Sequence, residues 1–344
     1  MLRNFFVVAA VLFLLSVAVA QPKAPSDALQ VYFIDVEGGQ ATLFVTPQHE
    51  SLLIDTGWPT ESAKRIVDVA HKAGLSRIDY VLITHYHEDH VGGVGELVKM
   101  IPVGTFIDHG ENRETPTPAR DPLIKTYKTI LADKQYKHLV LKPGDSLPIK
   151  GMESVVVSGD GNVIAKPLAG GGQKNAACEG SQKYPADQTE NGRSLGVLFT
   201  FGSLRILDLG DLTSDRELAL MCPVNNLGRV DIYIVSHHGW KESGSPALLR
   251  GISPRIAIMD NGAKKGGSPS AWDVIHSTSS VEDLWQLHYS EEGGASHNSP
   301  GPLIANLQGR DAGNYLELIA SPDGGFDVYN SRTQRTKHYR AREQ

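Results

Sequence analysis

A dense group of polar side chains follows residues 78–84, an apolar run typical of a buried strand. The next six residues, His85-Tyr86-His87-Glu88-Asp89-His90, offer four potential metal ligands. Imidazole and carboxylate are the usual ligands of zinc and similar divalent ions. Because the chain has only 13 histidines in 344 residues, three within six positions are improbable by chance. The sequence therefore predicts a metal site at a strand end, where Gly92 and Gly93 let the backbone turn tightly.

Strand and helix signals alternate on both sides of this cluster. Aliphatic and β-branched runs, broken by glycine and proline, predict strands over residues 29–36, 41–46, 52–55, 105–108, 154–157, 195–201, 204–207, 232–235 and 255–259. Apolar residues at helical spacing predict helices over residues 60–73, 94–100 and 122–132, and residues 85–93 are expected to form a loop. Strands interleaved with helices in both halves favour an α/β fold of two sheets with helices outside.

Residues 159–193 are rich in polar residues and glycine and poor in apolar ones. A segment of this length inside a compact domain is typical of a functional lid or an inserted loop, so we expect an inserted loop here. The two cysteines, Cys178 and Cys222, do not form a CxxC metal motif. In an exported protein they could form one disulfide, and two unpaired thiols are the alternative.

The N-terminus has the pattern of a signal peptide. Arg3 precedes an apolar run over residues 5–19, and Ala18-Val19-Ala20 is a small-x-small triplet before Gln21. An uncleaved anchor is the alternative, but the run is short for a bilayer span. We therefore expect a signal peptide over residues 1–20 and an exported protein, periplasmic or secreted, with no stable membrane span after cleavage. The net charge of −6 and the lack of a basic tract leave a nucleic-acid substrate unsupported by charge.

Four segments resemble motifs of the metallo-β-lactamase fold superfamily. His85-Tyr86-His87-Glu88-Asp89-His90 matches its HxHxDH motif, and Leu53-Ile54-Asp55-Thr56-Gly57 is similar to its first motif. Asp208-Leu209-Gly210-Asp211 and Ser236-His237-His238-Gly239 are similar to its later ligand motifs. The resemblance covers essentially the whole mature chain. It implies a four-layer αββα sandwich of two mixed sheets with outer helices, formed by one hydrolase domain over residues 21–344.

The resemblance also implies two metal ions in one site. The residues it implies are His85, His87 and His109 for the first ion, Asp89, His90 and one histidine of the pair 237 and 238 for the second, and Asp211 as the bridge. His237 is favoured, because it directly follows the predicted strand 232–235 and Ser236. His238 is the alternative to His237, and whichever histidine does not bind metal could act on the substrate. Asp89 or Asp211 could orient the attacking hydroxide, and Asp55 is a candidate acceptor for a ligating imidazole. A solvated or capping role is the alternative for His109, as helix capping is for Asp211.

These residues predict a dinuclear hydrolase that uses a metal-bound hydroxide. Zinc is the default ion for such ligands, and manganese or iron is compatible with them. Residues 33–41 and 190–195 are similar to the hydrolase domain of ComEC-type competence proteins, which implies a small-molecule phosphoester or a phosphodiester as substrate. Gln40 departs from that pattern, because an acidic residue is usual there.

Three alternatives remain open at this point. A β-lactamase or a lactonase would use the same ligands on a different bond, and a non-catalytic metal-binding or partner-binding protein could keep the same scaffold. Lys264 and Lys265 could contact an anionic group, and a solvated turn is the alternative for them.

Overall fold

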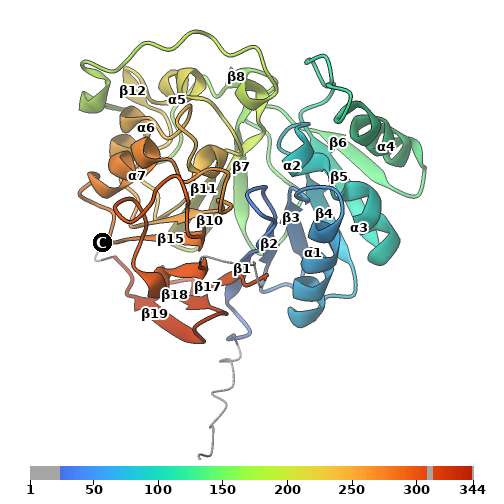
Figure 1. The fold of residues 1–344 in the computed structure, drawn as a ribbon. Coiled ribbons are helices and arrows are strands. Elements are labelled where there is room, and N and C mark those ends of the chain that lie inside the picture. The colour runs from blue at the N-terminus through green and yellow to red at the C-terminus, as the bar shows by residue number, and fades with distance from the viewer. Residues whose placement is uncertain (1–23, 308–312, 343–344) are drawn as a thin grey trace, which may run out of the picture.

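Two mixed β-sheets lie face to face between layers of helices in the computed structural model of the chain (Figure 1). The structure describes residues 24–307 and 313–342, so the predicted signal peptide lies outside the described residues. In this described part the first sheet has nine strands in the order β19-β18-β17-β1-β2-β3-β4-β5-β6, and the second has eight in the order β16-β15-β14-β13-β11-β10-β7-β8. This architecture confirms the predicted αββα sandwich.

The strand bounds follow the chain order. The first sheet contains β1 (Leu29–Phe33), β2 (Thr42–Val45), β3 (Ser51–Ile54), β4 (Ile78–Leu82), β5 (Val103–Asp108), β6 (Lys137–Val140), β17 (Leu316–Ala320), β18 (Phe326–Asn330) and β19 (Arg335–Tyr339). The second contains β7 (Glu153–Gly159), β8 (Asn162–Val163), β10 (Gly196–Phe201), β11 (Leu204–Asp208), β13 (Ile232–Ile234), β14 (Ile256–Met259), β15 (Asp283–His288) and β16 (Ile304–Asn306). A small third sheet pairs β9 (Gln173–Lys174) with β12 (Val224–Asn225).

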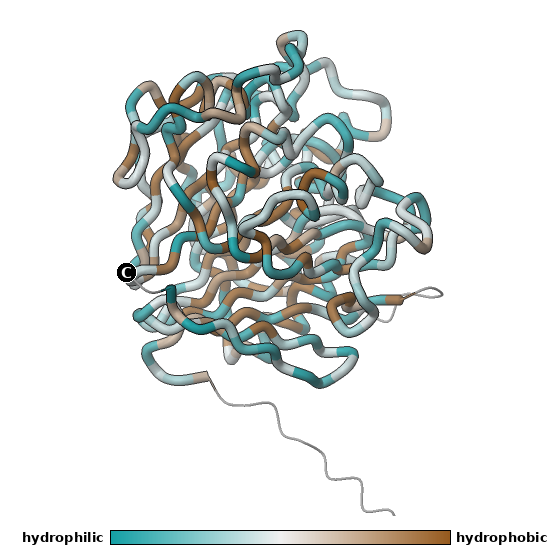
Figure 2. Tube along the Cα trace, turned by 90° about the vertical axis from the view of Figure 1, so that its left-hand side faces the viewer, coloured by the Kyte–Doolittle hydropathy of each residue, from teal (hydrophilic) through white to brown (hydrophobic). Residues whose placement is uncertain are grey.

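Helices cover the outer face of each sheet. The helices α1 (Glu61–Lys72), α3 (Val94–Met100) and α4 (Asp121–Ala132) pack on the first sheet, and α5 (Ser214–Met221), α6 (Pro246–Ile252) and α7 (Pro269–His276) pack on the second (Figure 1). In α1, Ala63, Ile66, Val67 and Ala70 recur at helical spacing and are all buried. The central core lies between the sheets, where the rings of Phe44 and Phe199 are 4.7 Å apart, centroid to centroid. In Figure 2 the apolar colour is concentrated along the strands inside the molecule.

Several elements of the structure have no predicted counterpart, among them the short strands β6, β8, β9 and β12. Residues 85–93 were expected to be a loop, but they contain the short helix α2 (Glu88–Val91), because a single turn shows no periodicity in sequence. The strands from β15 to β19, at the C-terminal end, have no predicted counterpart. In β19 four of five residues are exposed, so its sequence lacks the apolar pattern of a buried strand.

The predicted inserted segment, residues 159–193, is anchored to the second sheet's helical layer. Cys178 forms a disulfide with Cys222, the residue that ends α5. β9 in this segment pairs with β12, and two short 3-10 helices, η1 (Ala176–Cys178) and η2 (Asn191–Arg193), complete it. The segment therefore returns to the sandwich at η2, directly before β10.

The carboxyl ends of parallel strands meet along one edge of each sheet. β3, β4 and β5 are parallel neighbours in the first sheet, and β11, β13 and β14 are parallel neighbours in the second. Loops at such ends are the usual position of ligand sites in α/β proteins. Each predicted metal-ligand motif follows one of these strands. None of the helices in the described part of the chain is long and apolar enough to span a bilayer.

Candidate metal centre

The histidine-rich segment combines extended chain with one helical turn. His85 and His87 lie in the extended stretch after β4, whereas Asp89 and His90 lie in α2. A Cβ atom at Gly93 would lie 2.2 Å from a backbone oxygen of the loop after β3. The predicted tight turn is therefore also a close approach between two loops, which holds the four side chains in place.

One buried group of potential ligands joins the two sheets. Asp89, His90, Asp211 and His238 each offer an atom within 4.8 Å of the others. The Nε2 of His90 lies 3.2 Å from Asp89 Oδ2, 3.2 Å from Asp211 Oδ2 and 3.2 Å from the Nε2 of His238. Two imidazole nitrogens and two carboxylates that face one common point form a donor set for a divalent cation.

A second group shares one member with the first. His85, His87 and Asp211 also offer atoms within 4.8 Å of one another. His85 Nε2 lies 3.8 Å from Asp211 Oδ2. Asp211 belongs to both groups, which is the arrangement expected of a bridging carboxylate.

The orphaned atoms of the cluster fit metal ions. His85 Nε2 and Asp211 Oδ1 are buried and have no hydrogen-bond partner. Buried polar atoms are normally paired, so atoms without a partner require an explanation such as an ion. Neutral imidazole and carboxylate are the ligands that zinc, manganese and iron accept. The residues present therefore fit a site for divalent ions.

The two adjacent histidines after β13 separate in space. His237 and His238 both have φ of 54°, a left-handed conformation that is uncommon outside glycine. This turn sends His238 into the buried group, whereas His237 Nε2 lies 3.4 Å from the Nδ2 of Asn191 and 3.5 Å from Asp211 Oδ2. The structure thus groups His238 with the other ligands, although the sequence analysis preferred His237.

His109 does not join either group. Its Nε2 lies 3.1 Å from Glu190 Oε2, and both side chains are fully buried. His87 has a similar neighbour, because Glu114 Oε2 lies 3.2 Å from its Nε2. The family resemblance was the reason to assign His109 to the first ion; the structure pairs its Nε2 with a carboxylate from the inserted segment and leaves its buried Nδ1 without a hydrogen-bond partner, so the assignment stays a prediction.

A carboxylate lies behind one histidine from each sheet. Asp55 Oδ2 lies 2.7 Å from His90 Nδ1, and Asp55 also accepts a hydrogen bond from the backbone N–H of Thr84. Asp260 Oδ1 lies 3.3 Å from His238 Nδ1. Such carboxylates fix the ring and strengthen its other nitrogen as a ligand. The contact expected for Asp55 is present, and Asp260 is its counterpart in the second sheet.

Gln40 also contacts an acid. Its Nε2 donates a hydrogen bond of 2.6 Å to Asp208 Oδ2. Burial raises the pKa of Asp208 to about 7. An acidic residue at position 40 would face Asp208 in the same buried place, so the amide removes a repulsion between two carboxylates.

Charges around the cluster shift the pKa values of its members. Burial by itself would raise the pKa of the Asp89 carboxyl, yet His90 and the ammonium of Lys265 hold it well below its usual range. Burial lowers the pKa of His237 to about 4, so its ring is neutral at neutral pH. Asp89 is therefore ionised, as a ligand must be.

Four residues of this environment were not among the predicted site residues: Glu114, Glu190, Asp260 and Lys265. Glu190 is the first residue of the segment 190–195 that resembles ComEC-type proteins, and Asp260 follows β14 as Asp55 follows β3, so both had a signal of position. We find no sequence signal for Glu114. Lys265 was considered only as a possible anion contact or a solvated turn.

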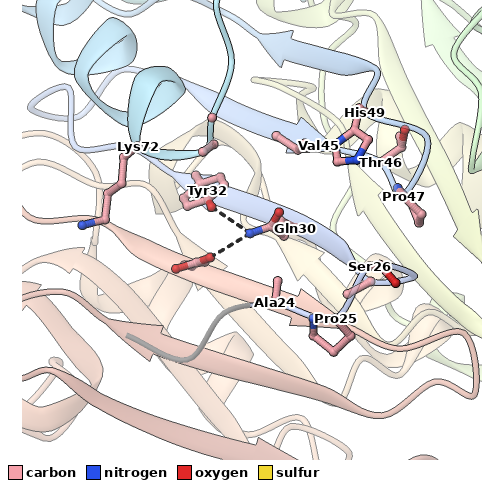
Figure 3. Close-up of a pocket in the computed structure, with 14 residues that line it drawn as sticks. Ala24, Pro25, Ser26, Gln30, Tyr32, Val45, Thr46, Pro47, His49 and Lys72 are labelled. Atoms are coloured by element: carbon pink, nitrogen blue, oxygen red, sulfur yellow. Dashed lines mark hydrogen bonds between the residues drawn. The ribbon is translucent and has the colours of Figure 1, made fainter. Parts of the chain in front are cut away.

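A separate cavity of about 710 Å³ lies at the amino end of β1 (Figure 3). Gln30 donates hydrogen bonds to Tyr32 and to Glu317 there, and Lys72 and His49 also line it. Its lining contains none of the predicted site residues. The candidate chemistry therefore belongs to the opposite end of the strands.

The comparison with protein families agrees with this geometry. The family model for the Metallo-beta-lactamase superfamily matches residues 35–170, which include Asp55 and the whole histidine-rich segment. Residues 35–170 are therefore identified with the metallo-beta-lactamase superfamily. The ligands Asp211 and His238 lie beyond the matched residues, and the fold brings them to the same site.

Curated relatives within this superfamily include much longer proteins. Recombination protein 2 of Haemophilus influenzae is 25% identical over 237 residues, which cover 68% of this chain and 24% of the relative. ComE operon protein 3 of Bacillus subtilis is 23% identical over 257 residues, which cover 68% of this chain and 28% of the relative. The chain thus spans about a quarter of the length of these relatives. Among solved structures, the metallo-beta-lactamase fold protein YhfI from Bacillus subtilis aligns with a TM-score of 0.46 at 13% identity, over 76% of this chain and 96% of that one.

Proposed function

We propose that the chain is a metal-dependent hydrolase with two divalent ions, and that it acts on phosphate esters. One observation carries the proposal. Two buried donor groups, one with Asp89, His90 and His238 and the other with His85 and His87, share Asp211. A carboxylate common to two groups is what a two-metal hydrolytic site requires.

The chain's own residues would bind the ions, orient the ligands and contact the substrate. When bound, two divalent ions would lower the pKa of a water and neutralise charge that develops on the substrate's oxygens. Zinc is the default, and manganese or iron fits the same ligands. Asp55 and Asp260 hold the rings of His90 and His238. The neutral ring of His237, beside Asp211, would donate a hydrogen bond to the substrate, the role that the sequence analysis left for the histidine outside the ligand set.

Two features support a phosphate ester over other substrates. Residues 33–41 and 190–195 resemble the hydrolase domain of ComEC-type competence proteins, and the structure places residues from both stretches beside the site. The ammonium of Lys265 contacts Asp89, so a positive charge faces the site. Because the chain spans only part of its long relatives, their roles as whole proteins are not carried over.

We also propose that the protein is exported to the periplasm or secreted. The disulfide between Cys178 and Cys222 supports this, because disulfides persist mainly in oxidising compartments. Fractionation of the native host, followed by thiol labelling of the secreted or periplasmic material, should find a processed chain with both cysteines blocked. A reduced, unprocessed chain in the cytoplasm would contradict the proposal.

Elemental analysis and a substrate panel test the hydrolase proposal. The purified protein should hold close to two divalent ions per chain and should hydrolyse p-nitrophenyl phosphate or its bis ester. His87→Ala should abolish that activity. His338→Ala is the matched control, because this histidine lies on β19 with 65% of its side chain exposed. Full activity without metal would refute the central claim, and turnover of only nitrocefin or a homoserine lactone would replace the phosphate ester by a lactam or lactone. Bound metal with no turnover at all would favour a binding protein.

A further inference from the structure

Lys265 is held in a fixed loop directly beside the metal-ligand cluster. The loop connects β14 to α7 and is fastened to the histidine turn, because the backbone N–H of Gly267 donates to the carbonyl of His238 at 2.9 Å. Within the loop, Gly262 N–H donates to the carbonyl of Lys265 at 2.8 Å. The backbone that carries Lys265 is therefore positioned by the same turn that positions His238.

The ammonium of Lys265, which comes from the loop after β14 in the second sheet, contacts two residues that follow strands of the first sheet. It donates a hydrogen bond to Asp89 Oδ2, the same oxygen that lies 3.2 Å from His90 Nε2 and 3.2 Å from His238 Nε2. It also lies 5.0 Å from the ring centroid of Trp58, in the loop after β3. The side chain stays 27% exposed, so solvent and solutes reach it.

A lysine in this position opposes the binding of metal. Its positive charge repels a divalent ion, and its ammonium competes with the ion for the carboxylate of Asp89. A site that only binds metal would not require such a residue. The same charge favours an anion, because hydrogen bonds from an ammonium to a charged oxygen are about twice as strong as neutral ones. The face of Trp58 stabilises the cation and limits where its flexible stem can go.

We propose that Lys265, held against Trp58, binds a negatively charged oxygen of the substrate next to the reacting centre. The residue thereby selects phosphate esters over uncharged esters and lactones. This inference rests on the proposed function and narrows it to one substrate class. A phosphate monoester spreads its negative charge over three oxygens, so one is left for Lys265 when the other two contact the ions, and an uncharged ester has no charged oxygen.

Phosphate binding and steady-state kinetics test the inference with Lys265→Ala, Lys265→Arg and the matched control Lys264→Ala. Lys264 is the exposed neighbour in the same loop. By isothermal titration calorimetry on the metal-loaded protein, Lys265→Ala should weaken the binding of inorganic phosphate by about 10-fold or more. Lys264→Ala should leave it unchanged, and Lys265→Arg should restore most of it because the charge remains. The KM for p-nitrophenyl phosphate should rise with the phosphate Kd, whereas the KM for uncharged p-nitrophenyl acetate should not change.

Two results would overturn the inference. Equal phosphate affinity in Lys265→Ala and in the unchanged protein would show that Lys265 does not bind the anion. A metal ion that appears in Lys265→Ala but not in the unchanged protein, by elemental analysis, would show that the lysine takes the place of an ion. Because phosphate affinity is read without turnover, a protein that hydrolyses no phosphate ester would refute the proposed function and still report on Lys265.

Discussion

The two sheets supply the candidate centre in different ways. The first sheet provides His85, His87, Asp89 and His90 from one segment of six residues. The second sheet provides Asp211, His238 and Lys265 from three separate loops, after β11, β13 and β14. Both sides place a carboxylate behind a histidine, Asp55 behind His90 and Asp260 behind His238. Both sheets contribute histidine and carboxylate side chains, but only those of the first sheet come from one short segment of the sequence.

The largest effect should come from the residue that joins the two sides. Asp211→Ala removes the carboxylate common to both groups, so we expect the loss of at least one ion and a fall in kcat/KM of about 10³-fold or more. Elemental analysis and steady-state kinetics measure both. Asp273→Ala, on α7 with 64% of its side chain exposed, is the control and should keep the ions. Two retained ions in Asp211→Ala would show that the shared carboxylate is not needed for binding either ion.

Substitution of His237 and of His238 should show which of these two adjacent histidines binds metal. His238→Ala should lose one ion and about 10²-fold or more of activity, because it removes a member of the buried group. His237→Ala should keep both ions and lower kcat by about 10-fold, the effect of one lost hydrogen bond. The reverse pattern of metal contents would restore the preference of the sequence analysis for His237.

Stability against pH should distinguish buried acids on the two sides. Burial raises the pKa of Glu217, in α5, from 4.5 to about 7, although it accepts hydrogen bonds from Gly244 N–H and Ser245 N–H. Because the pKa of Glu217 is higher in the folded state, the native state binds more protons than the unfolded state between pH 4.5 and about 7. The free energy of unfolding should therefore fall by about 3 kcal/mol as the pH rises from below 4.5 to above 7.

Chemical denaturation across this pH range checks the slope. Glu217→Gln should flatten it, because the amide does not titrate. Glu50 on the first side is the control, since Lys150 holds its pKa below the usual value and its contribution runs in the opposite direction. An unchanged slope in Glu217→Gln would exclude this acid as the cause.

The smallest effect should come from Asp55 and Asp260, the carboxylates behind His90 and His238. Asp55→Asn should weaken metal affinity by about 10- to 100-fold, the usual effect of losing such a partner. Asp260→Asn should weaken it less, because its oxygen lies 3.3 Å from His238 whereas that of Asp55 lies 2.7 Å from His90. Competition with a chromophoric chelator measures both affinities. Equal losses would mean that the two sides orient their histidines equally well.

The residues of the centre on the first sheet were easier to predict from the sequence than those on the second. The segment from His85 to His90 was evident in sequence because its ligands are adjacent, and Asp211 followed from the family resemblance. The choice between His237 and His238 could not be made, since it depends on two consecutive left-handed residues. The partner of His109 was also hidden, because Glu190 reaches it from a segment distant in sequence.

The fold was predictable from the sequence only in part, because buried strands such as β15 to β18 were missed as well as the exposed β19. The strands from β1 to β5 and the strands β7, β10, β11, β13 and β14 were found within a few residues, because continuous apolar runs mark them. β17 joins the centre of the first sheet by pairing with β1, an arrangement that no local signal specifies. Long-range pairing of this kind is a property of the whole chain.

The position of Asp211 has a thermodynamic consequence. This residue belongs to the second sheet, yet it shares both donor groups with histidines of the first. An ion held there would bind the folded chain, in which both sheets supply its ligands, and would have little affinity for the unfolded chain. By mass action, ion at a thousand times its dissociation constant would add about 4 kcal/mol to the free energy of unfolding. Metal supply would then govern how long the folded chain survives proteolysis, in addition to how fast it works.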